Sequence, residues 1–363
     1  MKQRLLKLNK NVYVAILAIL LILILVYKES IVETSHLCGL AGKLLGSDCL
    51  VAYKRGMYID FLPDGQHIIR SKDGRTFAIQ PVNLTNTFSS VEFGLEEHPF
   101  PEFYMREHAG SSDLSRVAAC VSPDDQTDEI WVWDVETQMV IQKIPDSNCK
   151  MEGRLHLLLS EDGRYVVSNA EEHIQLFDLE NEERLIREGK GQTIVSSAQD
   201  LLVFIADENT IKLVDINGEE TEKEILLPKP IEQVEDVGLA ISANGSLLAL
   251  NDAGHISLWQ ITDGSLVSEL EPAQASTGFL YDVVSFSEDG KFVASNVYHW
   301  NDEENLVIGY VYIWNVENGD LQWQKRIGES VIITAVSISP DNSLVAVGTG
   351  QGSFVFKTNI VSE

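Results

Sequence analysis

The side chains that most often carry out chemistry are present in this chain, but their spacing matches no familiar catalytic or metal-binding motif. The eight histidines are spread along the sequence without the spacing of metal ligands. Examples are His67, His156, His173 and His255. No glycine-rich phosphate loop, Gly-x-Ser-x-Gly elbow, His-Glu-x-x-His or Cys-x-x-Cys occurs. We therefore expect a protein that is not an enzyme and that has no cofactor and no metal site.

The acidic segment Asp124–Glu129 is the stretch that most resembles a cation site. It lacks the glycine and the bidentate glutamate of a calcium loop, so we expect a solvated turn. An alternative stays open, because paired carboxylates for glycoside hydrolysis can come from distant parts of a chain, and sequence spacing does not reveal them.

The chain contains four cysteines, an even number that favours disulfides in an oxidising compartment. Cys38 with Cys49 is one candidate pair, and Cys120 with Cys149 is another. The second pair would close a loop of about 30 residues and contribute roughly 3 to 4 kcal/mol of stability. Buried free thiols are the alternative.

Two aromatic-rich segments, Phe93–Arg106 and Asn296–Asn305, interrupt the regular pattern described below and are expected to be surface insertions. Aromatic side chains with polar neighbours are good anchors for a protein partner, and loops on a rigid scaffold often carry function. The expected contact residues are Phe100, Phe103, Tyr104, Tyr298, His299 and Trp300. The alternative is that these aromatic side chains fill the core.

The elements that would position these segments are short strands that recur along the chain. In Phe286–Ser295 a strand, an Asp-Gly turn and a second strand follow one another, and Val311–Asn315 is a third strand. Similar turns occur at Leu62-Pro63-Asp64-Gly65, Ser160-Glu161-Asp162-Gly163, Ser242-Ala243-Asn244-Gly245 and Ser339-Pro340-Asp341-Asn342.

The ends of the third strands recur at intervals of about 35 to 55 residues, which is typical of a repeat architecture. They are Ile79-Gln80, Trp133-Asp134, Phe177-Asp178, Val214-Asp215, Trp259-Gln260, Trp314-Asn315 and Phe356-Lys357. Seven units follow from this pattern.

From about Leu50 to Lys357 the units resemble the WD-repeat β-propeller family, whose blades read as strand, Ser-Pro-Asp-Gly turn, strand and a strand ending in Trp-Asp. The match is degenerate. Only Trp133-Asp134 is a literal Trp-Asp, and the family's Gly-His pair between blades is missing, since Gly254-His255 precedes a third strand instead. The resemblance implies an all-β, seven-bladed β-propeller that scaffolds protein complexes, with a propeller of a related family as the alternative.

Ring closure is expected to involve the beginning of the propeller, residues 49–363. A fourth strand follows most units, as in Leu321–Lys325, but only six residues follow Lys357. We expect Cys49–Tyr53 to supply the missing outer strand of the last blade, so that no long sheet edge is left unpaired.

The N-terminal region has the pattern of a membrane anchor. Residues 1–11 are basic, and residues 12–28 are expected to form a transmembrane signal-anchor helix because Val12–Tyr27 is apolar and spans about 24 Å as a helix. The basic flank places the N-terminus in the cytoplasm and the propeller in the periplasm or outside the cell. Residues 29–48 are a juxtamembrane spacer. The alternative is secretion after signal-peptide cleavage.

The charge of the chain excludes one class of partner. The formal net charge is −28, and all five basic residues before Glu29 lie outside the expected propeller, which is therefore more acidic still. Nucleic-acid binding requires a basic surface, so no nucleic-acid partner is expected. The acids can simply keep the protein soluble, or they can form a surface for a basic partner.

These patterns together predict a membrane-tethered propeller that is not catalytic and mediates protein–protein interactions outside the cytoplasm. Its partners are other proteins, and it meets the membrane through the N-terminal helix. The alternative from another class is a propeller hydrolase or small-ligand sensor with a site at the mouth of the central channel.

Overall fold

The structure is a computed structural model of the 363-residue chain. It describes residues 50–54, 59–62, 65–71, 76–82, 91–94, 105–111, 113–121, 129–145, 155–170, 173–196, 200–216, 223–231, 234–272, 282–301, 305–350 and 352–360. The expected transmembrane segment 12–28 and the spacer 29–48 lie outside these ranges. Among the described residues, none of the helical segments has the length and apolar composition of a membrane span.

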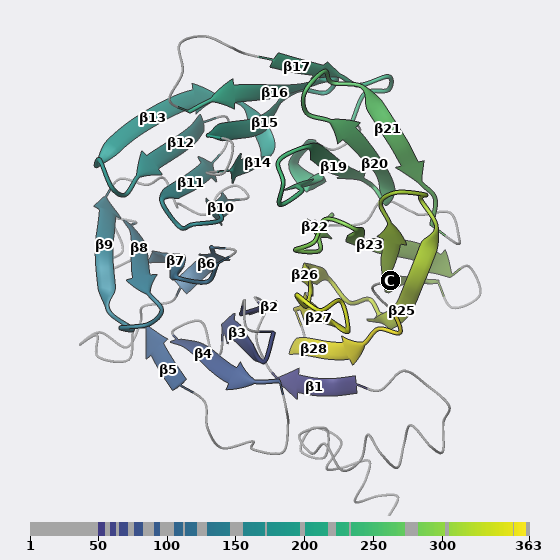
Figure 1. Cartoon of the computed structure of the whole chain (residues 1–363), viewed down its shortest axis with the longest axis horizontal. Helices are drawn as coiled ribbons and strands as arrows, with labels where there is room; N and C mark the ends of the chain where they lie inside the picture. Colours follow the sequence, from purple (N-terminus) through teal and green to yellow (C-terminus); the bar gives the residue numbers. More distant parts are fainter. Residues whose placement is uncertain are drawn as a thin grey trace, which may run out of the picture.

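The described residues form seven four-stranded antiparallel sheets, arranged as the blades of a β-propeller around a central axis (Figure 1). Blade 1 contains β2 (Ile59–Phe61), β3 (His67–Ser71), β4 (Thr76–Pro81) and β5 (Val91–Gly94). Blade 2 contains β6 (Met105–Gly110), β7 (Arg116–Val121), β8 (Glu129–Asp134) and β9 (Val140–Pro145). Blade 3 contains β10 (Leu155–Leu159), β11 (Tyr165–Ala170), β12 (His173–Asp178) and β13 (Glu183–Glu188). Blade 4 contains β14 (Lys190–Ser196), β15 (Leu201–Asp207), β16 (Thr210–Asp215) and β17 (Lys223–Leu226).

The other three blades complete the ring (Figure 1). Blade 5 contains β18 (Gly238–Ile241), β19 (Leu247–Asp252), β20 (His255–Gln260) and β21 (Leu266–Leu270), and a short 3-10 helix, η1 (Val234–Asp236), precedes it. Blade 6 contains β22 (Val284–Phe286), β23 (Phe292–Asn301), β24 (Leu306–Asn315) and β25 (Leu321–Glu329). Blade 7 contains β26 (Ile333–Ile338), β27 (Leu344–Thr349), β28 (Gly352–Lys357) and β1 (Leu50–Lys54). The prediction of a seven-bladed propeller is confirmed.

Closure of the ring by the first strand is also confirmed. β1 pairs antiparallel with β28, with Leu50 opposite Phe356 and Lys54 opposite Ser353. The last blade thus takes its outer strand from the start of the propeller, and the two ends of the ring are joined in one sheet.

The core lies between neighbouring blades, where the apolar faces of adjacent sheets pack together. Between blades 1 and 2, for example, Phe77 contacts Trp133 edge to face, with ring centroids 5.9 Å apart. Seven apolar residues were expected near the ends of the third strands. Ile79 is half-buried, and the other six are buried, namely Trp133, Phe177, Val214, Trp259, Trp314 and Phe356. Each blade therefore depends on its neighbours for its stability.

The turn between the first and second strands is the most regular local feature. In blade 3 the Ser160 hydroxyl donates to Asp162 Oδ1 (2.8 Å) and accepts a hydrogen bond from the backbone NH of Tyr165 (2.9 Å). The same arrangement joins Ser111 to Asp113, Ser242 to Asn244, Ser287 to Asp289 and Ser339 to Asp341. The serine hydroxyl and the tight turn thus provide hydrogen-bond partners for backbone groups that have no partner in a neighbouring strand.

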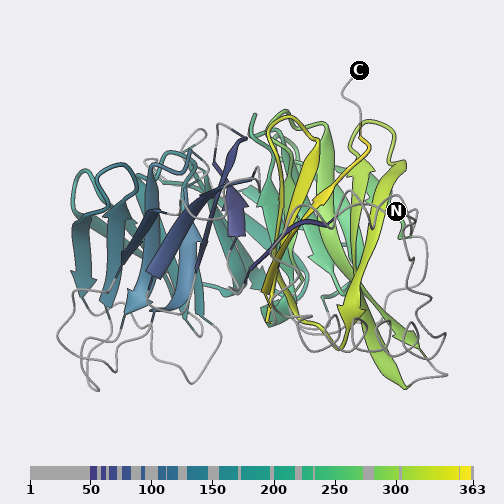
Figure 2. The same cartoon turned by 90° about the horizontal axis from the view of Figure 1, so that it is seen from below.

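The antiparallel order places the connections on two opposite faces of the ring. The turns between first and second strands and between third and fourth strands lie on one face, which we call the turn face. It is at the top of Figure 2. The second-to-third-strand turns and the links between blades lie on the other, which we call the linker face.

One of the two expected insertions is corrected by the strand boundaries. Asn296–Asn301 continues β23, and residues 306–315 continue the same hairpin as β24, so most of this segment is sheet. In the segment 93–106, Phe93 belongs to β5 and Met105 and Arg106 belong to β6, and residues 95–104 lie outside the described ranges. The strand alternation of β23 continues through Tyr298, His299 and Trp300, the aromatic residues that had suggested a loop.

Candidate protein interface

The hairpin β23–β24 of blade 6 is longer than the hairpins of the other blades. Its ten residue pairs extend from Phe292 opposite Asn315 to Asn301 opposite Leu306. The inner strand β22 has only three residues, so it accompanies just the beginning of β23. The green hairpin reaches beyond the neighbouring strands on the linker face (Figure 2). It therefore projects from the described fold on the linker face.

Tyr298 holds this hairpin against blade 7. Its side chain is 1% exposed, and its hydroxyl accepts a hydrogen bond from the backbone NH of Ile333 (2.9 Å). Burial raises the pKa of the Tyr298 hydroxyl. Gly309 lies opposite Tyr298, and a Cβ there would meet the Tyr298 ring at 3.3 Å. The glycine thus makes room for the ring.

His299 points to the other side of the sheet, because successive side chains of a strand alternate. Its Nε2 lies 2.9 Å from the Tyr312 hydroxyl, and its ring meets the Tyr310 ring edge to face at 4.9 Å. The Tyr312 ring stacks on Trp314. Burial raises the pKa of Tyr312 to about 12, so this hydroxyl stays protonated at neutral pH. These rings fasten the hairpin to its own blade.

Trp300 is the exposed member of this group. Its side chain is 46% exposed, whereas Tyr298 and His299 are buried. The expectation that all three form surface contacts is therefore corrected for Tyr298 and His299, which support the hairpin from inside. Tyr298 and His299 point to opposite faces of β23 because side chains alternate along a strand. Both are buried because neighbouring sheets cover both faces of this strand. Phe100, Phe103 and Tyr104 lie outside the described residues.

The base of the hairpin meets the links between blades 5 and 6. The side chain of Asp282 is buried just before β22, and its Oδ2 accepts a hydrogen bond from the backbone NH of Ala253 (2.5 Å). Its own backbone NH donates to the carbonyl of Asp236 (2.8 Å). Burial raises the pKa of Asp282 to about 7, and the nearby carboxylate of Asp252 adds to the rise.

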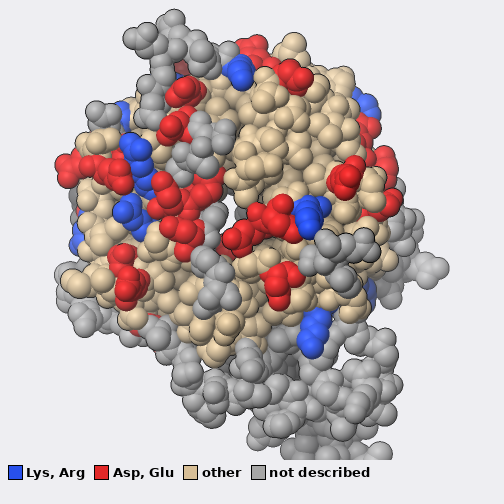
Figure 3. Space-filling view, viewed as in Figure 1, with Lys and Arg blue, Asp and Glu red and all other residues tan. Residues whose placement is uncertain are grey.

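The turn face has a different character, because it is acidic around the central opening. Figure 3 shows Asp and Glu side chains on both sides of this opening. The first-to-second-strand turns carry Asp113, Glu161, Asp162, Asp200, Glu288, Asp289 and Asp341. Several of these carboxylates already stabilise their turns. Burial alone would raise the pKa of Asp341, but hydrogen bonds from Ser339 and Ser343 outweigh it and lower the pKa.

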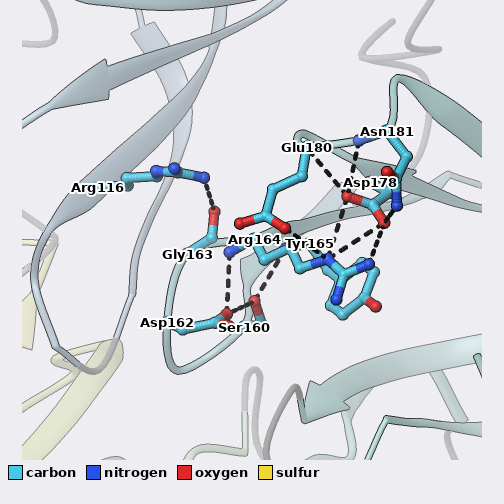
Figure 4. Close-up of polar contacts among 9 residues, drawn as sticks. All are labelled: Arg116, Ser160, Asp162, Gly163, Arg164, Tyr165, Asp178, Glu180 and Asn181. Carbon is cyan, nitrogen blue, oxygen red and sulfur yellow. Dashed lines mark hydrogen bonds and ion pairs between the residues drawn. The ribbon is translucent and has the colours of Figure 1, made fainter.

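An ion pair fastens the turn of blade 3 to the end of its third strand (Figure 4). Arg164 Nη2 lies 2.6 Å from Asp178 Oδ2. Burial of Asp178 works against its ionisation, but hydrogen bonds from Arg164, the Glu180 backbone and Asn181 lower its pKa to about 2. The carboxylate raises the pKa of Arg164 in turn. These contacts stabilise the turn and the end of β12.

The turn also joins neighbouring blades. Arg116 of blade 2 donates from Nη1 to the carbonyl of Gly163 in blade 3 (2.9 Å), as Figure 4 shows. A Cβ at Gly163 would lie 2.9 Å from Cδ of Arg116. Gly163 also has a φ of +70°, which L residues rarely adopt. The turn therefore requires glycine for both reasons.

A second contact between blades repeats near the linker face, at the ninth residue after the turn serine. Asn169 donates to Thr193 Oγ1 (2.9 Å), and Asn251 donates to Ser295 Oγ (2.7 Å), in each case reaching the next blade. Cys120 occupies this position in blade 2, and it is disulfide-bonded. The other cysteines, Cys38, Cys49 and Cys149, lie outside the described residues.

Two features of this region escaped the sequence analysis. The turn Ser111–Asp113 was missed because Leu114 occupies the left-handed position (φ 47°) where the other turns have glycine or asparagine. Asp282 gave no signal, because a single acid next to a strand is usually exposed. Within the described residues, no group of three or more His, Cys, Asp or Glu could hold a metal ion.

No protein-family model matches the sequence, and no curated protein matches it.

Proposed function

We propose that the protein is a membrane-tethered propeller scaffold that binds partner proteins outside the cytoplasm and does not itself catalyse a reaction. The observation that carries this proposal is Trp300, a large aromatic side chain that is 46% exposed on a long, firmly packed hairpin. Exposed aromatic side chains on rigid elements are typical anchors of protein interfaces, because little conformational entropy is lost on binding.

The order of segments along the sequence supports the membrane tether and its orientation. β1 begins at Leu50, two positions after the end of the spacer 29–48, so a helix at residues 12–28 would hold the propeller close to the membrane. The basic residues before that helix favour a cytoplasmic N-terminus. The disulfide at Cys120 agrees with an oxidising compartment on the other side. We propose Cys149 as its partner, because it lies in the link that follows blade 2.

We also propose that the chain is a WD-repeat propeller. The repeated serine–aspartate turn and the Arg164–Asp178 ion pair support this relationship, because each connects a turn to the strands of its blade. In blade 2, Asp134 of the Trp133-Asp134 pair accepts hydrogen bonds from the backbone NH and hydroxyl of Thr137. The expected role of such a ring is to hold several proteins together.

Site-specific crosslinking in intact membranes tests the interface. A photoreactive amino acid at position 300 should give discrete crosslinked products, and the same group at Leu226 should not. Leu226 is a matched control because it is an exposed apolar residue, 69% accessible, on the outer strand of blade 4. Trp300→Ala should weaken recovery of the same products while the melting temperature changes little. Equal products at both positions would contradict the proposal.

A channel-mouth hydrolase or small-ligand sensor is the second candidate, and the acidic surroundings of the central opening favour it (Figure 3). Metal analysis of the purified full-length protein decides between them. Stoichiometric metal that is lost together with a hydrolytic activity would favour this candidate, and a metal-free protein that still crosslinks through position 300 would favour the scaffold.

A further inference from the structure

Asp282 is a buried carboxyl group at the point where blades 5 and 6 meet. Its side chain is 6% exposed, and it lies between the link that leads into β22 and the turn between β19 and β20. Ala253 in that turn has a φ of +53°, and its backbone NH points at Asp282 Oδ2 (2.5 Å). A side-chain contact across the junction therefore fixes an unusual backbone conformation on the other side.

The two backbones are also in close contact. Asp282 donates from its backbone NH to the carbonyl of Asp236, at the end of η1. A Cβ on Gly238 would lie 2.6 Å from the carbonyl oxygen of Asp282, so only glycine fits. The junction is thus tightly packed and offers a buried charge little room to attract water.

Within the described residues, the titratable groups placed near Asp282 do not neutralise a negative charge. They are Asp252 at the end of β19 and Tyr298 of β23, whereas Asp236 of η1 contacts Asp282 through its backbone carbonyl. Neither Asp252 nor Tyr298 is a cation. A buried carboxylate is costly when its described neighbours include no cation, because it loses its hydration and the hydrogen bond from the Ala253 NH compensates only part of that loss. The protonated form keeps that contact without the charge.

The same junction supports the long hairpin. Val283, the next residue, donates its backbone NH to Asn296 Oδ1 of β23 (2.8 Å). Asn251 of blade 5 donates to Ser295 Oγ, also in β23. Tyr298, three residues after Ser295 in β23, interacts electrostatically with Asp282 and fixes the hairpin to blade 7. A shift at Asp282 would therefore reach β23, the strand that carries Trp300.

We propose that the junction between blades 5 and 6 is a proton-sensitive latch, closed while the Asp282 carboxyl is protonated and loosened when it ionises. The raised pKa, about 7, places the change near neutral pH. The latch makes the hairpin β23–β24 most firmly held in acid. That partner binding follows the latch rests on the proposed function, whereas the latch itself does not.

Amide hydrogen exchange of the full-length protein tests the latch. Protection factors, corrected for the intrinsic pH dependence of exchange, are measured at about pH 6 and about pH 8, one unit on each side of the pKa. Peptides covering 238–254 and 282–301 should lose protection at the higher pH, and peptides from blade 3 should not. Equal behaviour of the junction and blade 3 would overturn the proposal.

Asp282→Asn is the decisive variant, because asparagine imitates the neutral acid and can still accept from Ala253. Its junction should keep the same protection at both pH values. Asp263→Asn is the matched control, because Asp263 is an exposed carboxylate in a turn of the same blade. It should respond to pH as the native protein does. If Asp282→Asn retains the native pH response, the latch is refuted. If the variant does not fold, the comparison of junction and blade 3 in the native protein still decides.

Crosslinking from position 300 at the two pH values tests separately whether the latch regulates partner binding. More product at the lower pH supports regulation of binding. Equal product at both, with a pH-dependent junction, rejects the regulation and leaves the scaffold intact. No product at either pH rejects the scaffold, and the latch is then judged by exchange alone.

Discussion

At the scale of single residues, two aspartates show how the surroundings decide the behaviour of one functional group. Asp178 is paired with Arg164 and accepts several hydrogen bonds, and its pKa falls to about 2. Asp282 is buried and lies near the carboxylate of Asp252, and its pKa rises to about 7. The first carboxylate stabilises the fold as an ion, whereas the second does so as a neutral acid.

For Asp178, replacement by asparagine should lower the free energy of unfolding at pH 7 by about 1 to 3 kcal/mol, since a charge-assisted contact with Arg164 is lost. The folded-state pKa lies below the ordinary value of 3.8. The contribution of the carboxylate is therefore present above about pH 4 and is lost as the pH falls toward 2. Denaturant unfolding of both proteins at several pH values checks this, and a difference that does not shrink in acid would contradict it.

Cys120 allows a second prediction at this scale. Reduction of its disulfide should lower the free energy of unfolding by about 2 to 5 kcal/mol, because the bond restricts the unfolded chain. Peptide mapping without reductant should yield a peptide in which Cys120 is joined to Cys149. Cys120→Ser should behave like the reduced protein. A map that joins Cys120 to Cys38 or Cys49 would refute the proposed pair.

At the scale of elements, the turn between first and second strands is the unit that repeats. Its serine is buried in each of the five examples: Ser111, Ser160, Ser242, Ser287 and Ser339. The hydroxyl both donates to the acidic or amide side chain two residues later and accepts from the backbone NH five residues later. Because it satisfies a buried backbone donor, its loss costs more than one ordinary hydrogen bond.

Ser160→Ala should accordingly destabilise the protein by about 1 to 3 kcal/mol, since the buried NH of Tyr165 loses its side-chain acceptor and Asp162 loses a donor. Thermal unfolding followed by circular dichroism measures the effect. Glu136→Ala is the control, because Glu136 is exposed in the turn after β8 and should change stability by less than about 0.5 kcal/mol. Similar losses in both variants would show that the turn network contributes little.

At the scale of the whole molecule, stability depends on closing the ring. In the part of the chain that the structure describes, the hydrophobic core is divided into clusters that adjacent blades share, so no blade is a complete folding unit. β1 completes blade 7 and covers the edge of β28, which would otherwise be open to pairing with another chain. The strand nearest the expected tether is thus also the strand that locks the ring.

Two truncations test this role of β1. A protein that begins at Cys49 should unfold at nearly the same temperature as a protein that also carries the spacer. A protein that begins at Arg55 lacks β1, and it should unfold at a lower temperature and aggregate through the exposed edge of β28. Calorimetry and size-exclusion chromatography make the comparison. Identical melting temperatures for the two truncations would show that closure by β1 is dispensable.

The sequence by itself determined the seven blades, their third strands and the closing strand. These features depend on local signals, namely Asp-Gly turns that require a left-handed residue and apolar side chains that alternate along a strand. Trp300 at the surface also agrees with the aromatic segment identified in the sequence. These local patterns are sufficient to predict the blades because every blade is built from the same kind of turns and alternating strands.

Only the tertiary structure decided the roles of Tyr298, His299 and Asp282. Tyr298 bonds to Ile333 of another blade, and Asp282 bonds to Ala253 of the preceding one, so their environments are made by residues far away in the sequence. Burial between two sheets turned expected contact residues into supports, and it turned an ordinary aspartate into an acid with a pKa of about 7. Desolvation is a property of the packed neighbours, and no local pattern encodes it.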